Sequence, residues 1–129
     1  MEASSLEEFY DFFYVGVSDY WKQHYTWGKK TSKNSKKIAK GFIDLLIINT
    51  IVPLKFSYYK FMGIENNTDV IDLVTSLSSE KNSIVERFKK LGVSSTTALD
   101  SQSILQLYNC YCQKNKCLDC AIGNKLLIN

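Results

Sequence analysis

The chain has 129 residues, the length of one ordinary domain, and 45% of them are apolar, which excludes a wholly disordered protein. One Pro and six Gly argue against a loop-rich β-sandwich and favour long helices. The net charge of +3 rests on Lys, with Arg87 as the single arginine. Because Arg dominates the recognition of base edges, this balance is unfavourable for reading a nucleic-acid sequence.

Targeting signals are not apparent at the start of the chain. Residues 1–8 are polar and acidic, without the basic and apolar regions of a secretory signal. The longest apolar stretch, 42–62, contains charged and strongly polar residues and a proline, which is unfavourable for a membrane span. These residues are Asp44, Asn49, Pro53, Lys55 and Lys60. We therefore expect a cytoplasmic protein with no membrane partner.

The predicted elements begin with a helix that starts at Ser5. Ser5 and Glu8 fit a capping box, and apolar residues recur at helical spacing as far as about His24. A polar loop is expected over 25–34. Ser35 can then cap a second helix.

This second helix runs into Pro53, which lacks a backbone donor and frees the carbonyl of Asn49. The sequence predicts a kink or a break there, and a helix end at Gly63. Because the helix is apolar nearly all round, we expect it to be central and buried. Asn49 and Asp44 are interpreted as structural residues, with Asp44 pairing with Lys40 one turn earlier.

Four shorter helices are expected in the remainder of the chain, the first three of them with a capping signal. No stretch alternates long enough to predict a strand. The predicted fold is therefore all-α: a small irregular bundle of about five or six helices around a buried, Pro-kinked central helix, in a single domain over 1–129. The expected signals are Asn67 or Thr68 (helix to Leu77), Ser83 with Glu86 (helix to Leu91, then Gly92), Asp100 (helix to near Cys112) and Cys117 (helix to Leu127).

Several short segments together carry a resemblance. They are Tyr20-Trp21-Lys22, Trp27-Gly28-Lys29, Ile43-Asp44 through Ile48-Asn49-Thr50 to Pro53, Glu80-Lys81-Asn82-Ser83, and Cys112-x4-Cys117-Leu118-x-Cys120-Ala121-Ile122-Gly123. On these segments nearly the whole chain resembles the carboxy-terminal half of a family of uncharacterised bacterial proteins, a domain of unknown function. The resemblance implies no activity. Because longer members carry an acidic amino-terminal region, it implies a truncated or partial member; Cys110 lies outside the shared pattern.

The four cysteines lie within eleven residues, at 110, 112, 117 and 120. In a reducing compartment such clusters are more often metal ligands, redox centres or buried thiols than disulfides. The Cys117-x2-Cys120 spacing is typical of zinc and iron–sulfur sites. We therefore treat Cys112, Cys117 and Cys120 as candidate ligands of zinc or an iron–sulfur cluster. Cys110 or His24 would be the fourth ligand, and inert thiols are the alternative.

Lysines are concentrated in the segment 22–40, which contains no acidic residue. Tryptophan and tyrosine alternate with the first of them, and cations beside aromatic rings can hold single-stranded nucleic acid by charge and stacking. The alternatives are a solvated lysine face beside two core tryptophans and a contact with an acidic protein domain. The candidate contact residues are Trp27, Lys29, Lys30, Lys33, Lys36 and Lys37.

No catalytic constellation is evident: the sequence lacks a glycine-rich phosphate loop and a second histidine. We expect a non-catalytic helical accessory or interaction module with a structural metal site at the C-terminal cysteine cluster. The alternatives are a nucleic-acid-binding module that uses 22–40, and part of an enzyme whose catalytic region lies outside this chain. An exposed apolar patch at Tyr58, Tyr59 and Phe61 would favour a homodimer.

Overall fold

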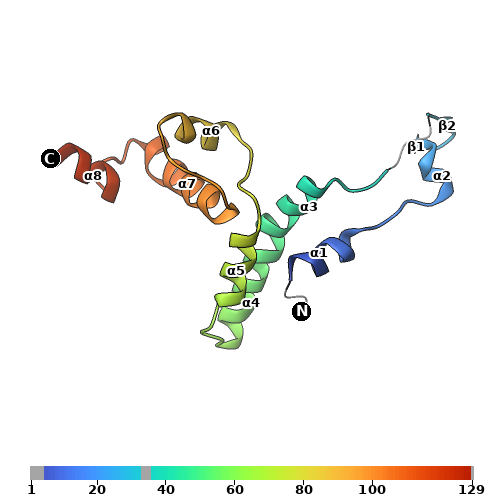
Figure 1. Cartoon of the computed structure of the whole chain (residues 1–129), viewed down its shortest axis with the longest axis horizontal. Coiled ribbons are helices and arrows are strands. Elements are labelled where there is room, and N and C mark those ends of the chain that lie inside the picture. The colour runs from blue at the N-terminus through green and yellow to red at the C-terminus, as the bar shows by residue number, and fades with distance from the viewer. Residues whose placement is uncertain (1–4, 33–35, 129) are drawn as a thin grey trace. The chain divides into compact units, whose positions relative to one another are not determined.

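The computed structural model describes residues 5–32 and 36–128. Over these residues the chain is mostly α-helical, with one short two-stranded sheet (Figure 1), so the expected helical fold class is confirmed. The chain forms two compact units, 1–73 and 74–129. The single domain over 1–129 stays a prediction.

The first unit opens with α1 (Leu6–Phe13). The predicted capping box is confirmed, because the Ser5 hydroxyl accepts from the Glu8 amide and the Glu8 carboxylate accepts from the Ser5 amide, both at 3.3 Å. The helix ends at Phe13, so its predicted extension to His24 is wrong. The segment 14–17 contains two β-branched valines around a glycine, and these residue types lower helix propensity.

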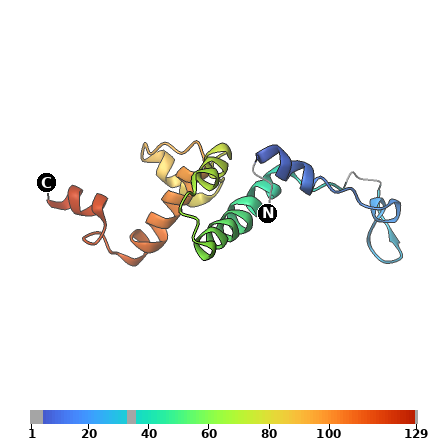
Figure 2. The ribbon, with the colours of Figure 1, turned by 90° about the horizontal axis from the view of Figure 1, so that it is seen from below.

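A short helix and a hairpin take the place of the predicted helix end and of the polar loop over 25–34. Helix α2 (Asp19–Lys22) leads into strand β1 (His24–Thr26), which pairs antiparallel with β2 (Lys29–Lys30), as Figure 2 shows. The chain reverses at Gly28, which has a φ of 74°. This left-handed conformation is readily available to glycine and allows the tight turn.

The long helix is continuous through the proline. Helix α3 (Lys40–Leu46) passes into a π-helical turn, η1 (Ile47–Ile51), and then into α4 (Val52–Met62). The wider π turn accommodates Pro53 without the break that the sequence predicts. The helix ends at Gly63 with a φ of 69°, as predicted.

The long helix supplies the buried residues Ile43, Ile47 and Ile48, but most of it is not buried as the sequence predicts. Only 22% of its most apolar window, which has a mean hydropathy of 1.3, is buried. By length and composition alone, Lys40–Met62 could cross a membrane, so the expectation of no membrane partner stays a prediction. The predicted cap of this helix, Ser35, lies outside the described residues.

Two polar side chains of the long helix, Asp44 and Asn49, have partners within the first unit. The Tyr10 hydroxyl donates to Asp44 at 2.5 Å, and among the described ion pairs the predicted one between Asp44 and Lys40 does not occur. The Asn49 amide donates to the carbonyl of Leu45 at 3.0 Å. Asp44 therefore ties α1 to α3, and Asn49 supports the π turn, which agrees with their structural interpretation.

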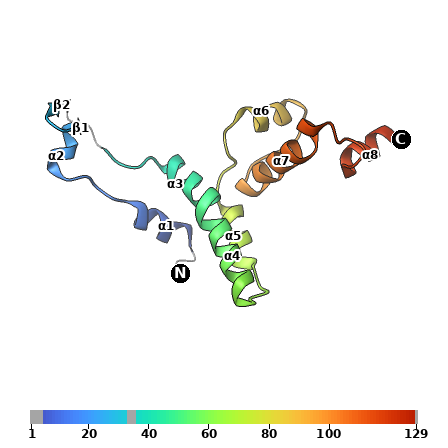
Figure 3. The same cartoon turned by 180° about the vertical axis from the view of Figure 1, so that it is seen from behind.

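Helix α5 (Thr68–Ser76) contains the boundary between the units, and the second unit continues with α6 (Ser83–Lys90) and α7 (Ala98–Cys110), which lie side by side in Figure 3. A 3₁₀ turn, η2 (Cys112–Lys114), and α8 (Ala121–Ile128) complete the described chain. The four predicted helices are thus present, although the last begins four residues later than expected. The buried apolar residues of this unit are Val74, Leu77, Val85, Ala98, Ile104 and Cys120.

Two of the predicted caps are displaced by a few residues. Asn82, rather than Ser83, caps α6 through two backbone amides at 3.0 Å. Thr97 caps α7, with Asp100 as the third helical residue of a capping box. The backbone amides of Thr97 and Thr96 lower the pKa of the Asp100 carboxyl from 3.8 to about 2.

Candidate functional site

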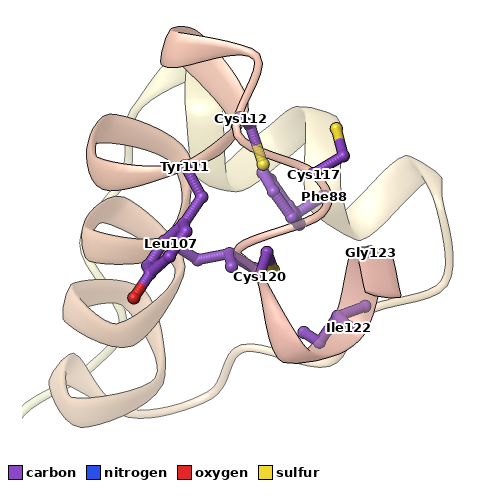
Figure 4. A pocket seen from close by; sticks show the side chains of 8 residues that line it. All are labelled: Phe88, Leu107, Tyr111, Cys112, Cys117, Cys120, Ile122 and Gly123. Carbon is purple, nitrogen blue, oxygen red and sulfur yellow. The ribbon is translucent and has the colours of Figure 1, made fainter. Parts of the chain in front are cut away.

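Three of the four cysteines line one pocket in the second unit. The pocket has a volume of about 150 Å³ and lies between α6, α7 and the start of α8 (Figure 4). Its apolar walls are the side chains that Figure 4 labels. The lining residues are Phe88, Leu107, Tyr111, Cys112, Cys117, Cys120, Ile122 and Gly123.

The predicted ligands occupy different environments. Cys120 is 7% exposed, whereas Cys112, Cys117 and Cys110 are exposed and Cys110 does not line the pocket. Figure 4 shows the sulfur atoms of Cys112 and Cys117 pointing in different directions. Over the described part of the chain, no three His, Cys, Asp or Glu side chains are grouped so that they could hold a metal ion. The structure therefore gathers three predicted ligands around one pocket without arranging them as a coordination sphere.

The shape of the pocket depends on a tight turn before α8. The amide of Cys120 donates to the carbonyl of Cys117 at 3.3 Å, and the side chain of Asn124 donates to the carbonyl of Leu118 at 3.2 Å. A Cβ atom on Gly123 would lie 2.3 Å from the Cys117 carbonyl oxygen. The Cys-Leu-x-Cys-Ala-Ile-Gly stretch therefore has a local structural role, in which glycine lets the helix approach the preceding backbone.

The alternative fourth ligand, His24, belongs to the first unit. It is 9% exposed, and its ring stacks on the Tyr20 ring with centroids 3.9 Å apart. Its Nδ1 lies 2.7 Å from the carbonyl oxygen of Tyr20, which accepts the hydrogen bond. His24 is thus part of an aromatic cluster, and its role as a ligand stays a prediction.

Three of the predicted nucleic-acid contacts, Trp27, Lys29 and Lys30, lie on the hairpin of the first unit. Trp27 is 78% exposed, so it is not the core tryptophan that one alternative interpretation requires. Lys29 and Lys30 are exposed on β2. Lys36 donates to the carbonyl of His24, which attaches the following segment to the hairpin.

The two remaining predicted contact lysines are Lys37 and Lys33. Lys37 donates to the hydroxyl of Tyr14. Lys33 lies outside the described residues.

A second exposed surface lies on α4 and is only partly anticipated by the sequence. Leu54, Tyr58 and Phe61 follow one another at i, i+4 and i+7, and are 53%, 50% and 86% exposed. We call these three residues the α4 face. Tyr58 and Phe61 are in the predicted patch, whereas Tyr59 is half-buried and donates to Asp69 at 2.6 Å.

Another side of α4 carries a buried charge that was not predicted from the sequence. Lys55 is 3% exposed and forms an ion pair with Asp69 of α5 at 2.7 Å. The hydrogen bonds from Lys55 and Tyr59 lower the pKa of the Asp69 carboxyl. A lysine inside an apolar run was the available signal. It indicates a buried partner, because a lone buried charge is too costly to keep.

Comparisons with known proteins give a family and no activity. A family model described as "Protein of unknown function (DUF2851)" matches residues 1–83. Searches of curated proteins and of solved structures found no match. The match confirms a relation to a domain of unknown function. It ends before the cysteine motif, so the motif and the placement in a carboxy-terminal half stay predictions.

Proposed function

Because the chain belongs to the DUF2851 family, whose function is unknown, we propose its role from its own surfaces: a non-catalytic helical interaction module that forms a homodimer through the α4 face. The observation that carries this proposal is the row of large, exposed apolar side chains Leu54, Tyr58 and Phe61 along one side of α4. A row of large apolar side chains on a water-facing helix is typical of a protein-binding surface.

The chemistry of the α4 face favours a second copy of this chain as the partner. The residues between and beside its three apolar side chains, Thr50 and Ser57, are uncharged and exposed. In a two-fold symmetric dimer each surface meets itself, so like charges on it would repel. A neutral apolar row avoids this repulsion, and burying it removes hydrocarbon from water.

We predict that Leu54→Ser combined with Phe61→Ser weakens self-association by at least about 100-fold, because a two-fold dimer loses four such side chains, each of which contributes about 1.5–3 kcal/mol when fully buried. Sedimentation equilibrium over a concentration series measures the change. The matched control is Leu91→Ser, which alters a 79% exposed leucine in the second unit and should leave association unchanged. Equal association of the double variant and the parent would contradict the α4 face.

A structural zinc or iron–sulfur site at the C-terminal cysteines is a secondary proposal, supported by the three cysteines around one pocket. A metal would have to draw the Cys112 and Cys117 sulfurs toward Cys120, with the fourth ligand from elsewhere. The thiolates would supply soft donors suited to zinc or iron.

We predict that anaerobically purified protein contains close to one equivalent of zinc, or of iron in a coloured cluster, by elemental analysis. Combined Cys112→Ser and Cys117→Ser substitutions should abolish this content, whereas Cys110→Ser should reduce it less. Less than about a tenth of an equivalent in the parent protein would end the metal proposal and favour inert thiols.

A further inference from the structure

We infer that the hairpin of the first unit binds single-stranded nucleic acid, with a base stacked on Trp27 and the phosphates beside Lys29 and Lys30. This surface consists of residues other than those of the α4 face. The inference therefore goes beyond the proposed homodimer and does not depend on it.

The geometry of Trp27 is that of a supported stacking platform. Its indole contacts Trp21, with ring centroids 5.0 Å apart, and Tyr20, at 5.3 Å. The Tyr20 hydroxyl accepts a hydrogen bond from the Gly28 amide at 3.0 Å, which fixes the turn next to Trp27. With 78% of its surface exposed, the indole is held from one side and open to solvent. A base that stacks on it would require little further ordering of the side chain.

The charge around this platform is positive. Lys29 and Lys30 are exposed on the strand that follows the turn, and neither has an ion pair within the described ranges. The neighbouring acid, Asp19, is engaged by Lys22 at 2.6 Å. Exposed lysines two and three residues after an exposed indole offer both kinds of contact that a nucleic-acid strand uses, charge for its phosphates and a ring for its bases.

A second aromatic group extends the surface along the hairpin. Tyr25 is 65% exposed, and the ammonium of Lys36 lies 3.6 Å from the centroid of its ring. This arrangement holds a further cation close to a further aromatic face. The hairpin and the Lys36 side chain attached to it thus offer two aromatic rings and three lysines.

The same residues favour a single strand without sequence preference. Bases in a duplex are stacked on each other and do not offer a free face, whereas those of a single strand do. No arginine occurs in 22–40, so the usual bidentate contact to guanine is missing. An acidic protein would contact the lysines, but it has no base to stack on Trp27. Dependence on Trp27 therefore distinguishes the two partners.

The test is a titration of the full chain, followed by tryptophan fluorescence, with a 15-residue oligothymidylate and separately with polyglutamate. Each titration is carried out at about 50 mM and at about 300 mM salt. We expect quenching by the oligonucleotide that weakens at the higher salt concentration. Trp27→Ala should reduce affinity by roughly 5- to 150-fold, whereas Trp27→Phe should retain most of it. Anisotropy of a labelled oligonucleotide gives the affinities of these two variants, and circular dichroism checks their fold.

Lys29→Gln combined with Lys30→Gln should reduce the slope of log affinity against log salt concentration by about 1.4 in magnitude. This is the value for the loss of two phosphate contacts on a single strand. The matched control is Lys89→Gln with Lys90→Gln, which removes two lysines from α6 and should leave binding unchanged. Three results would overturn the inference: no salt-sensitive binding at the lower salt concentration, equal affinity of Trp27→Ala and the parent, or binding of polyglutamate with the same dependence on Trp27. The α4-face variants should bind the oligonucleotide like the parent, so failure of the dimer proposal is recognised separately.

Discussion

Gly123 occupies a position at which the backbone of Cys117 leaves no room for a side chain. A methyl group there would lie 2.3 Å from the carbonyl oxygen and 3.0 Å from the carbonyl carbon. Because these are backbone atoms, they cannot rotate away as a flexible side chain would. The glycine thus joins the last helix to the turn that contains two of the cysteines.

We predict that Gly123→Ala lowers the free energy of unfolding of the second unit by about 1–3 kcal/mol, since overpacking forces the backbone to shift. Urea unfolding followed by circular dichroism measures the effect. Gly41→Ala is the control, because Gly41 lies within α3 with no atom within 4 Å of its added Cβ. That substitution should leave stability unchanged or raise it by up to ~1 kcal/mol.

Lys55 is the most deeply buried charged side chain among the described residues, and its charge is balanced by Asp69. Removing Asp69 would leave an ammonium group buried without a partner, whereas removing the charge of Lys55 would not. The two substitutions are therefore not equivalent, although both delete the same ion pair.

We predict that Asp69→Asn destabilises the first unit by about 1–3 kcal/mol, below the value for a fully buried pair because Asp69 is 36% exposed, and that Lys55→Met costs less. Because the pKa of the Asp69 carboxyl is lowered, the contribution of the ion pair to stability is fully present above the ordinary carboxyl pKa of 3.8. This contribution is lost progressively as the pH falls below that value. In urea unfolding at pH 7, 5 and 3, the free energy of unfolding should fall less with decreasing pH in Asp69→Asn than in the parent protein. An equal fall in the two proteins would contradict this role of the ion pair.

At the scale of the elements, the capping signals carried most of the correct predictions. Ser5 with Glu8 starts α1, and Gly63 ends α4, because these residues satisfy end groups that every helix leaves open. Helix spacing alone did not predict the end of α1, where the Val-Gly-Val segment outweighs a continuing apolar pattern. The hairpin was missed because its strands contain only three and two residues, too few to show alternation.

The long helix illustrates a different limit of sequence reasoning. An apolar composition predicts burial only if some element covers each face, and composition does not say what covers it. In the first unit one side of α4 packs through Lys55, and the α4 face is left to solvent. The π turn before Pro53 was also not predictable, since a break, a kink and a wider turn can each accommodate a proline that lacks a backbone donor.

The spacing of the cysteines led to a proposed common site for Cys112, Cys117 and Cys120, with Cys110 or His24 as the fourth ligand. In the structure the first three line one pocket and Cys110 does not, and metal binding by them stays a prediction. Spacing does not determine which way each sulfur points, because that depends on the turn held by Gly123 and Asn124. The exposure of Trp27 likewise depends on how the hairpin folds, so it could not be predicted from the neighbouring residues in the sequence.

At the scale of the whole molecule, we propose an interaction module with two separate contact surfaces in its first unit. The α4 face is neutral and apolar, whereas the hairpin is basic and aromatic. These chemistries suit different partners, a second copy of the chain and a nucleic-acid strand. Substitutions on one surface should therefore leave binding at the other unchanged.

The mass of the unmodified chain in solution tests the central claim most directly. Sedimentation equilibrium at micromolar concentrations should give twice the chain mass of 14.8 kDa, with dissociation toward that value on dilution. A mass of 14.8 kDa that persists up to several hundred micromolar would show that the α4 face does not bind a second copy.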